Sequence, residues 1–278
     1  METISKAKAH GGVQGVYRHE STATKTPMTF AVFVPPQAAL GKVPVLWYLS
    51  GLTCTHANVM EKGEYRAAAA KHGVILVAPD TSPRGPGVPD EPDNWQFGSG
   101  AGFYVDATAA PYATNYRMAS YILDELPALI AAEFPADMSR QGIFGHSMGG
   151  HGALTMALKH ADRFRSCSAF APIVQPSTAE WSRPALMKYL GADESAWRAY
   201  DAVALIEDGK RFPEFLVDQG TADSFLTTGL RPELLEAACR KAGIPLTLNM
   251  REGYDHSYYF ISTFMADHVA WHAERLTG

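Results

Sequence analysis

Residues 145–149 hold a serine in the pattern Gly-x-Ser-x-Gly, with Gly145, Ser147 and Gly149 at the fixed positions. A serine hydroxyl can attack a carbonyl carbon when a neighbouring base accepts its proton. The pattern is short, and unrelated chains contain it in ordinary glycine-rich turns. It therefore raises the hypothesis of a serine nucleophile, which the surrounding elements must support.

The segments on either side of this serine favour the catalytic interpretation. Residues 140–144 can form a short buried strand, and residues 150–158 have the composition of a helix. A sharp turn from strand to helix is the setting of a nucleophile elbow, in which the serine adopts a strained backbone conformation. Side chains at the flanking positions would clash, which explains the two glycines. We predict that Ser147 is the nucleophile.

A base must come from one of ten histidines. In proteins built around such an elbow the chain order is Ser, then Asp or Glu, then His, which leaves His256, His268 and His272. The last two are four residues apart on a predicted terminal helix, and we expect them on a solvated face. His256 follows the last predicted strand, beside Gly253, and we predict that it is the base.

The third member of the triad should lie on the loop after the preceding strand. Asp223 lies on that loop, whereas Asp218 is still within the strand and is less able to reach the base. Asp255 is adjacent to the base and cannot easily turn back to orient it. The sequence therefore predicts a Ser147–His256–Asp223 triad that performs acyl transfer.

The oxyanion that such an attack produces needs preorganised hydrogen-bond donors. One is the backbone N–H of the residue after the nucleophile, here Met148. The other comes from the loop after the third core strand, and we predict the N–H of Leu52, with Gly51 allowing a tight turn. Cys54 follows on the same loop, where it either packs as a small buried residue or lies at the substrate entrance.

Strands and helices alternate along most of the chain, which predicts an α/β fold with a mostly parallel central sheet and helices on both faces. The predicted strands are residues 13–18, 28–34, 43–49, 74–78, 140–144, 164–170, 214–219 and 245–250. The predicted helices are residues 59–71, 115–133, 150–158 and 232–242, with a last one ending at Leu276. We expect a single domain over residues 1–278, with an insertion at about 172–212.

Two irregular segments break this alternation, at residues 79–113 and 171–211. The first lies just beyond the carboxyl end of a central strand, where ligands bind in open α/β sheets. We interpret the second as a roof over the site. Trp95, Phe97 and Trp181 are candidate walls of an acyl pocket, as is Trp197, although the roof tryptophans could instead anchor the insertion.

Bulk properties exclude several functional classes. A net charge of -5 with mixed signs argues against nucleic acid as a partner. No apolar run is long enough to span a membrane. Three irregularly spaced cysteines suit a reducing compartment. No cofactor-binding or metal-binding motif is present, so we expect neither group.

Several stretches together resemble the S-formylglutathione hydrolase (esterase D) family. They are residues 50–55, 78–85, 98–108, 116–118, 145–152, 197–201 and 254–260. The resemblance spans the chain and implies an α/β hydrolase fold, usually in a homodimer. It implies a cytoplasmic thioesterase that splits S-formylglutathione into formate and glutathione in formaldehyde detoxification. The family triad maps onto Ser147, Asp223 and His256, and the oxyanion donors map onto Leu52 and Met148; Gln96 and Gln219 depart from the family pattern.

Two other functional classes are also compatible with the sequence. A general short-chain carboxylesterase, or an acyltransferase of the same fold, would share every triad residue and differ only in pocket and acceptor. A non-enzymatic binding module on this fold would usually lack a triad member, because fold alone does not fix function. All three candidates are present here, which favours an enzyme.

Overall fold

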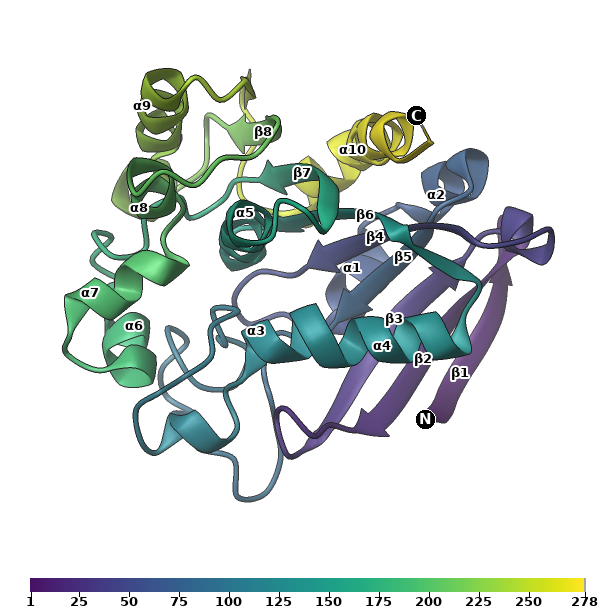
Figure 1. The fold of residues 1–278 in the computed structure, drawn as a ribbon, viewed down its shortest axis with the longest axis horizontal. Helices are drawn as coiled ribbons and strands as arrows, with labels where there is room; N and C mark the ends of the chain where they lie inside the picture. Colours follow the sequence, from purple (N-terminus) through teal and green to yellow (C-terminus); the bar gives the residue numbers. More distant parts are fainter. Residues whose placement is uncertain (278) are drawn as a thin grey trace.

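The computed structural model describes residues 1–277, and one nine-stranded sheet runs through it (Figure 1). The strand order is β1-β2-β3-β5-β4-β6-β7-β8-β9. The strands are β1 (Glu2–Ala9), β2 (Gly12–Glu20), β3 (Pro27–Val34), β4 (Val43–Leu49), β5 (Ile75–Pro79), β6 (Ala136–His146), β7 (Phe164–Phe170), β8 (Phe215–Gly220) and β9 (Leu246–Arg251). Pairing is antiparallel from β1 to β5 and parallel from β5 to β9.

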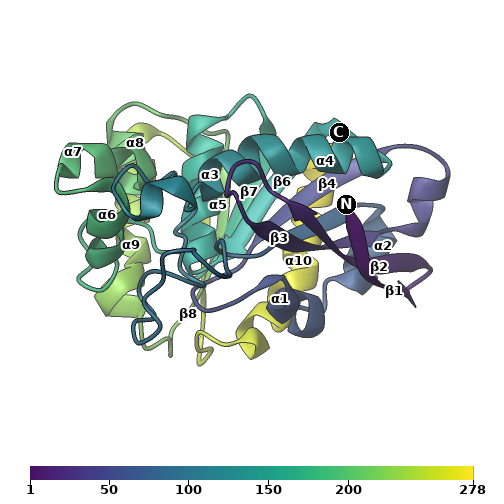
Figure 2. The same ribbon diagram turned by 90° about the horizontal axis from the view of Figure 1, so that it is seen from below.

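Helices cover both faces of the sheet, which confirms the predicted α/β class (Figure 2). One face carries α4 (Leu126–Glu133) and α5 (Met148–Lys159), and the other carries α1 (His56–Lys62), α2 (Arg66–His72) and α10 (Tyr258–Thr277). The remaining helices are α3 (Met118–Ser120), α6 (Arg183–Leu190), α7 (Glu194–Trp197), α8 (Ala202–Glu207) and α9 (Pro232–Ala242). Short π-helical turns span Tyr121–Glu125 and Leu226–Leu230.

The central strands are buried along their whole length because helices cover them above and below. Every residue of β4 and β5 is buried, and both strands are rich in Val, Leu and Ile. Such continuous apolar runs are typical of parallel strands enclosed on both faces. The carboxyl ends of β4, β6, β8 and β9 therefore meet at one edge of a rigid sheet, and the loops that leave them can hold side chains in fixed positions.

The prediction omitted β1 and joined two helices into one. Strand β1 is an edge strand with exposed side chains, so its sequence shows no apolar alternation. The helix predicted over residues 59–71 is wrong, because α1 ends at Lys62 and α2 begins at Arg66. Between them Glu64 has a φ of 56°, a left-handed conformation that interrupts a helix.

The insertion at residues 172–212 forms a helical layer at one end of the sheet, where α6, α7 and α8 lie in Figure 1. It contains no strand, as predicted. Asp201 caps α8 by accepting the Ala204 N–H at 2.9 Å, and the Ser177 hydroxyl donates to the same carboxylate. These bonds tie the start of the insertion to its last helix.

Candidate active site

Ser147 lies on a sharp turn between β6 and α5. Its φ of 58° and ψ of -116° are rarely adopted by a residue with a side chain. A Cβ added at Gly145 would lie 2.5 Å from the carbonyl oxygens of Leu49 and Gly149, and one at Gly149 would overlap the Leu49 oxygen. The two glycines therefore let the turn pack against the end of β4, and the serine has the strained geometry predicted for an elbow.

His256 and Asp223 lie together on the loops after β9 and β8. The His256 Nδ1 atom is 2.5 Å from the Asp223 Oδ2 atom. The Asp223 carboxylate is buried and also accepts the Phe225 backbone N–H at 2.8 Å and the Gln219 side-chain amide at 3.2 Å. These donors fix the carboxylate, which in turn fixes the His256 ring with its Nε2 atom free for chemistry. Gln219 is one of the two positions at which the sequence departs from the family pattern, and its side chain contacts Asp223 directly.

Asp218 and Asp255, the two carboxylates not chosen as the third triad member, bond to other residues. Asp218, buried within β8, accepts the Arg251 guanidinium at 2.7 Å and the Asn249 amide at 2.8 Å. Asp255 is exposed and accepts the Ser257 backbone N–H at 2.9 Å and its hydroxyl at 2.6 Å. The structure therefore brings only one of the three considered carboxylates to the His256 ring.

The expectation that His268 and His272 lie on a solvated face is wrong. Both are buried, because α10 packs this face against β6 and β7. The His272 Nδ1 and Nε2 atoms are 2.6 Å and 2.8 Å from the Ser166 and Ser168 hydroxyls, and Ser168 also bonds His268 at 2.8 Å. Their helical spacing with Met265, Val269 and Leu276 is the apolar signal that could have revealed this burial.

The predicted oxyanion loop follows β4 and lies against the elbow. Leu52 is half-buried on the cavity that Ser147 also lines, and Met148 is the buried first residue of α5. A Cβ at Gly51 would lie 3.1 Å from the His146 Nδ1 atom and 3.2 Å from the Ser147 Cβ atom. Glycine at this position thus permits the close approach of loop and nucleophile.

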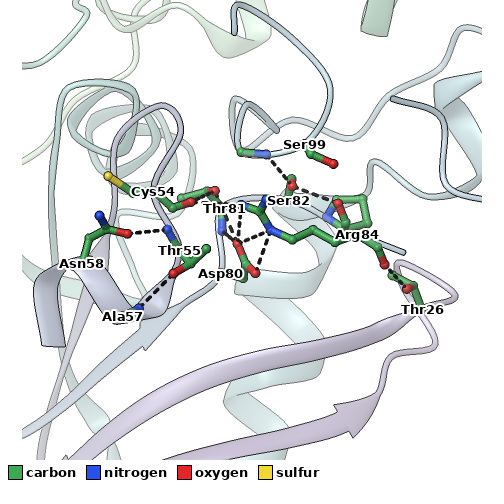
Figure 3. A network of polar contacts seen from close by, with 12 residues as sticks. Thr26, Cys54, Thr55, Ala57, Asn58, Asp80, Thr81, Ser82, Arg84 and Ser99 are labelled. Carbon is green, nitrogen blue, oxygen red and sulfur yellow. Dashed lines mark hydrogen bonds and ion pairs between the residues drawn. The ribbon is translucent and has the colours of Figure 1, made fainter. Parts of the chain in front are cut away.

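A polar network braces the far side of this loop (Figure 3). The Arg84 guanidinium donates to the Cys54 carbonyl at 3.1 Å and to the Asp80 carboxylate at 3.0 Å, and the Thr81 hydroxyl donates to the same carbonyl at 2.5 Å. The Thr53 N–H donates to the Gly100 carbonyl at 2.9 Å. The long irregular segment after β5 therefore holds the loop in place, a role that sequence reasoning missed.

Ser147 and His256 line a cavity of about 380 Å³. Its wall includes Ser147, His256, Leu52, Cys54, Asn58, Trp95, His146, Trp181, Phe225 and Tyr258. Trp181 lies between two other rings, with centroids 5.7 Å from Trp95 and 5.9 Å from Phe225. Cys54 is half-buried in the same wall, and burial raises the pKa of its thiol.

Two candidate wall residues do not line this cavity. Phe97 is buried, and the Lys188 ammonium lies 5.2 Å from its ring centroid. Trp197 is fully buried and donates its indole N–H to the Gly191 carbonyl at 2.9 Å, so it anchors the insertion instead of forming a wall. A bulky aromatic in the correct segment indicates burial, but the sequence does not show which side the ring faces.

His146 is a cavity residue that sequence reasoning missed. Its ring is buried, its centroid lies 4.3 Å from that of His256, and neither nitrogen has a hydrogen-bond partner among the described residues. Burial, and then the proximity of His256, hold the pKa of His146 well below its usual value. An uncharged His146 ring would not repel a positive charge on the neighbouring His256 imidazole.

The described residues contain no group of three metal-ligating side chains and no helix long and apolar enough to cross a membrane.

The Esterase family model, described as "Putative esterase", matches residues 21–273. The chain is 54% identical to an S-formylglutathione hydrolase of Paracoccus denitrificans over 99% of this chain and 98% of that one. It is 52% identical to an S-formylglutathione hydrolase of Mus musculus over 100% of this chain and 99% of that one. A solved S-formylglutathione hydrolase from Agrobacterium tumefaciens has 66% identity and a TM-score of 0.99, covering 99% of this chain and 100% of that one.

Proposed function

The chain belongs to the S-formylglutathione hydrolase family, and we propose that it hydrolyses S-formylglutathione to formate and glutathione through Ser147, His256 and Asp223. The residue assignment rests on one observation: His256 lines the same cavity as the strained Ser147 and bonds the buried Asp223 carboxylate. Each residue follows a different strand of the parallel half of the sheet, so the sheet fixes their mutual positions.

In the first half-reaction the Ser147 oxygen attacks the formyl carbon while the His256 Nε2 atom takes the serine proton. The carbonyl electron pair moves to oxygen, and the N–H groups of Met148 and Leu52 receive this oxyanion. Asp223 holds the Nδ1–H tautomer and stabilises the imidazolium. When the oxyanion collapses, the carbon–sulfur bond breaks, and glutathione leaves as a thiol with the proton from His256. Ser147 is then formylated.

In the second half-reaction His256 takes a proton from water, and the hydroxyl oxygen attacks the formyl ester. Collapse breaks the bond to the Ser147 oxygen, which recovers its proton from His256, and formate is released. Trp95, Trp181 and Phe225 form an aromatic wall of the cavity. We expect this wall to accept a formyl group, which has no side chain, and to disfavour larger acyl groups by steric clash.

The test compares kcat/KM for S-formylglutathione with kcat/KM for p-nitrophenyl acetate. We expect a strong preference for the thioester, and we expect Ser147→Ala to abolish turnover of both substrates at an unchanged Tm. A preference for the aryl ester would favour a general short-chain carboxylesterase. Transfer of the formyl group to an alcohol in place of water would favour an acyltransferase. A folded Ser147→Ala variant with substantial activity would remove Ser147 as the nucleophile.

We further propose that residues 1–278 form one domain and that two such chains form a homodimer, as the family resemblance suggests. The continuous nine-stranded sheet supports the first point, and sedimentation analysis tests the second. The three cysteines, Cys54, Cys167 and Cys239, are all free thiols, which supports the proposal of a reducing, cytoplasmic location.

A further inference from the structure

A second cavity of about 590 Å³ opens beside the catalytic cavity, between the α1–α2 turn and the start of α10. Its lining residues are Lys62, Glu64, Ser257, Tyr258, Tyr259 and Ser262. Tyr258 lines both cavities, so its side chain is a wall that the two spaces share. A substrate bound at Ser147 that extends past this side chain would reach the second space.

The second cavity presents one positive and one negative charge that the protein itself does not neutralise. Lys62 and Glu64 are both exposed, and among the described residues neither side chain takes part in an ion pair or hydrogen bond. In a continuous helix, residues two positions apart do not share a face. The left-handed conformation of Glu64 breaks the helix and lets both residues line one cavity.

The distance along α1 matches the reach of a glutathionyl group. Asn58 lines the catalytic cavity, and Lys62 lies one turn further on, about 6 Å along the helix axis. From the cysteine sulfur of glutathione to the α-carbon of its γ-glutamyl residue are seven bonds, or roughly 9 Å when extended. The Lys62 charge also reaches the catalytic wall. Burial is the main influence on the pKa of Cys54 and raises it, and Lys62 is the strongest opposing influence.

We infer that this second cavity binds the γ-glutamyl end of the substrate, with Lys62 facing its α-carboxylate and Glu64 facing its α-ammonium group. The inference rests on the proposed function, because it takes glutathione as the leaving group. The γ-glutamyl end carries both charges on one carbon, which suits a site with one cation and one anion. The glycine end carries only a carboxylate and would leave Glu64 facing a like charge.

These contacts are remote from the reacting carbonyl and are the same in the ground state and the transition state. Such uniform binding lowers KM and leaves kcat unchanged. Because Lys62 and Glu64 are exposed, water and salt weaken each ionic contact to about 1 kcal/mol, which corresponds to roughly a 5-fold effect on KM.

The experiment measures kcat and KM for Lys62→Gln on four substrates. They are S-formylglutathione, S-formyl-γ-glutamylcysteine, S-formyl-N-acetylcysteinylglycine and p-nitrophenyl acetate. We expect KM to rise roughly 5-fold for the first two, which carry the γ-glutamyl group, and to stay unchanged for the last two. Lys71→Gln, which removes the charge of an exposed lysine on α2, is the matched control and should change none of them.

A second variant tests the ammonium contact. Acetylation of the γ-glutamyl amine of S-formylglutathione should raise KM for the wild type but not for Glu64→Gln. Equal effects of Lys62→Gln on all four substrates would overturn the inference, as would an effect on the cysteinylglycine substrate alone, which would assign the site to the glycine end. Failure of the proposed function is a separate outcome, seen as a wild type that does not prefer S-formylglutathione.

Discussion

At the scale of single residues, the hydrogen bonds of Asp223 decide how the proposed base is held. This carboxylate accepts hydrogen bonds from Phe225, Gln219 and His256 on its two oxygens. An asparagine amide has only one acceptor oxygen, so its NH₂ group would face at least one of these donors. An asparagine would also favour the wrong His256 tautomer. We predict that Asp223→Asn lowers kcat on the order of 10⁴-fold, measured on S-formylglutathione.

The matched control is Asp255→Asn, one residue before the base. That carboxylate is exposed and bonds only to Ser257, so we expect kcat within about 2-fold of the wild type. If Asp255→Asn were the damaging change and Asp223→Asn were not, the orienting residue would have to be reassigned.

Cys54 is the residue through which thiol reagents should inactivate the enzyme. It is half-buried in the wall of the catalytic cavity, whereas Cys167 and Cys239 are buried in the core. An adduct on Cys54 would fill the acyl site or displace the Leu52 N–H, and a shift of about 1 Å can cost roughly 10²-fold in rate. We predict that N-ethylmaleimide inactivates the wild type, as followed by residual activity.

The pH dependence and the variants identify the thiol. Burial raises the pKa of Cys54, and the thiolate is the reacting form, so inactivation should accelerate as the pH rises above neutral. Cys54→Ser should remain active and resist the reagent, while Cys167→Ser and Cys239→Ser should stay sensitive. Inactivation of Cys54→Ser at the wild-type rate would place the sensitive thiol elsewhere.

At the scale of elements, the segment after β5 holds the proposed oxyanion loop in place. Arg84 joins Asp80 to the Cys54 carbonyl, so it acts on the reaction only through this loop. We predict that Arg84→Met lowers kcat roughly 10- to 100-fold on both S-formylglutathione and p-nitrophenyl acetate, because both reactions form an oxyanion. Arg84→Lys should recover part of this loss, since lysine can pair with Asp80 but lacks the second donor branch.

The loss of Arg84 also leaves a largely buried Asp80 carboxylate without its cation. The double variant Arg84→Met with Asp80→Asn therefore serves as a control for that unpaired charge. It should regain thermal stability without regaining kcat. Recovery of kcat together with Tm would show that Arg84 acts only on stability.

The roof insertion should limit the length of the acyl group through Trp181. Its indole lies between Trp95 and Phe225 over the catalytic cavity. We predict that Trp181→Ala raises kcat/KM for p-nitrophenyl butyrate relative to the acetate by about 10-fold. Phe97→Ala is a matched control, because Phe97 is buried away from the cavity wall and its truncation should leave this ratio unchanged. Equal ratios in Trp181→Ala and the wild type would contradict the prediction.

Sequence patterns predicted those elements whose signal is local. The buried strands β4 and β5 appear as continuous apolar runs, and the elbow requires two glycines because of backbone clashes nearby. Strand β1 could not be predicted this way, because an exposed edge strand has no apolar face. Glu64 gave no signal either, since its left-handed conformation depends on the packing around it. Candidate catalytic residues were found because strand ends meet at one edge in a parallel sheet.

Contacts between distant segments could not be predicted from local sequence patterns. The bond from Arg84 to the Cys54 carbonyl joins residues 30 positions apart, and nothing in either segment indicates the pairing. The same holds for the His146 ring against His256, and for the difference between Trp181 on the cavity wall and Trp197 as an anchor. Each depends on how whole layers pack.

At the scale of the whole molecule, the fold buries histidines in their neutral form. Burial lowers the pKa of His268, holds the pKa of His146 and His272 well below the usual value, and lowers that of His151 to about 4. An unfolded chain protonates these rings near pH 6.5, but the native protein does not. Between pH 6.5 and about 4 the unfolded state therefore binds more protons, and the native state loses stability as the pH falls.

We predict that the free energy of unfolding, measured by urea denaturation, is nearly constant above pH 7 and falls steeply between pH 6.5 and 5.5. His146, His151 and His272, whose pKa values lie far below 6.5 in the native state, each contribute about 1 kcal/mol to the loss over that interval. Carboxylates with lowered pKa, such as Asp218, begin to contribute only near pH 4 and below.

The variant that tests this account is His151→Gln, because the His151 ring is fully buried and a glutamine amide can replace its bond to the Phe103 carbonyl. Whatever its stability at pH 7.5, this variant should lose about 1 kcal/mol less than the wild type between pH 6.5 and 5.5. His10→Asn, in the exposed β1–β2 turn, is the control and should keep the wild-type slope. An unchanged slope in His151→Gln would mean that other groups carry the acid sensitivity, since a ring kept neutral by burial must contribute its missing proton to this difference.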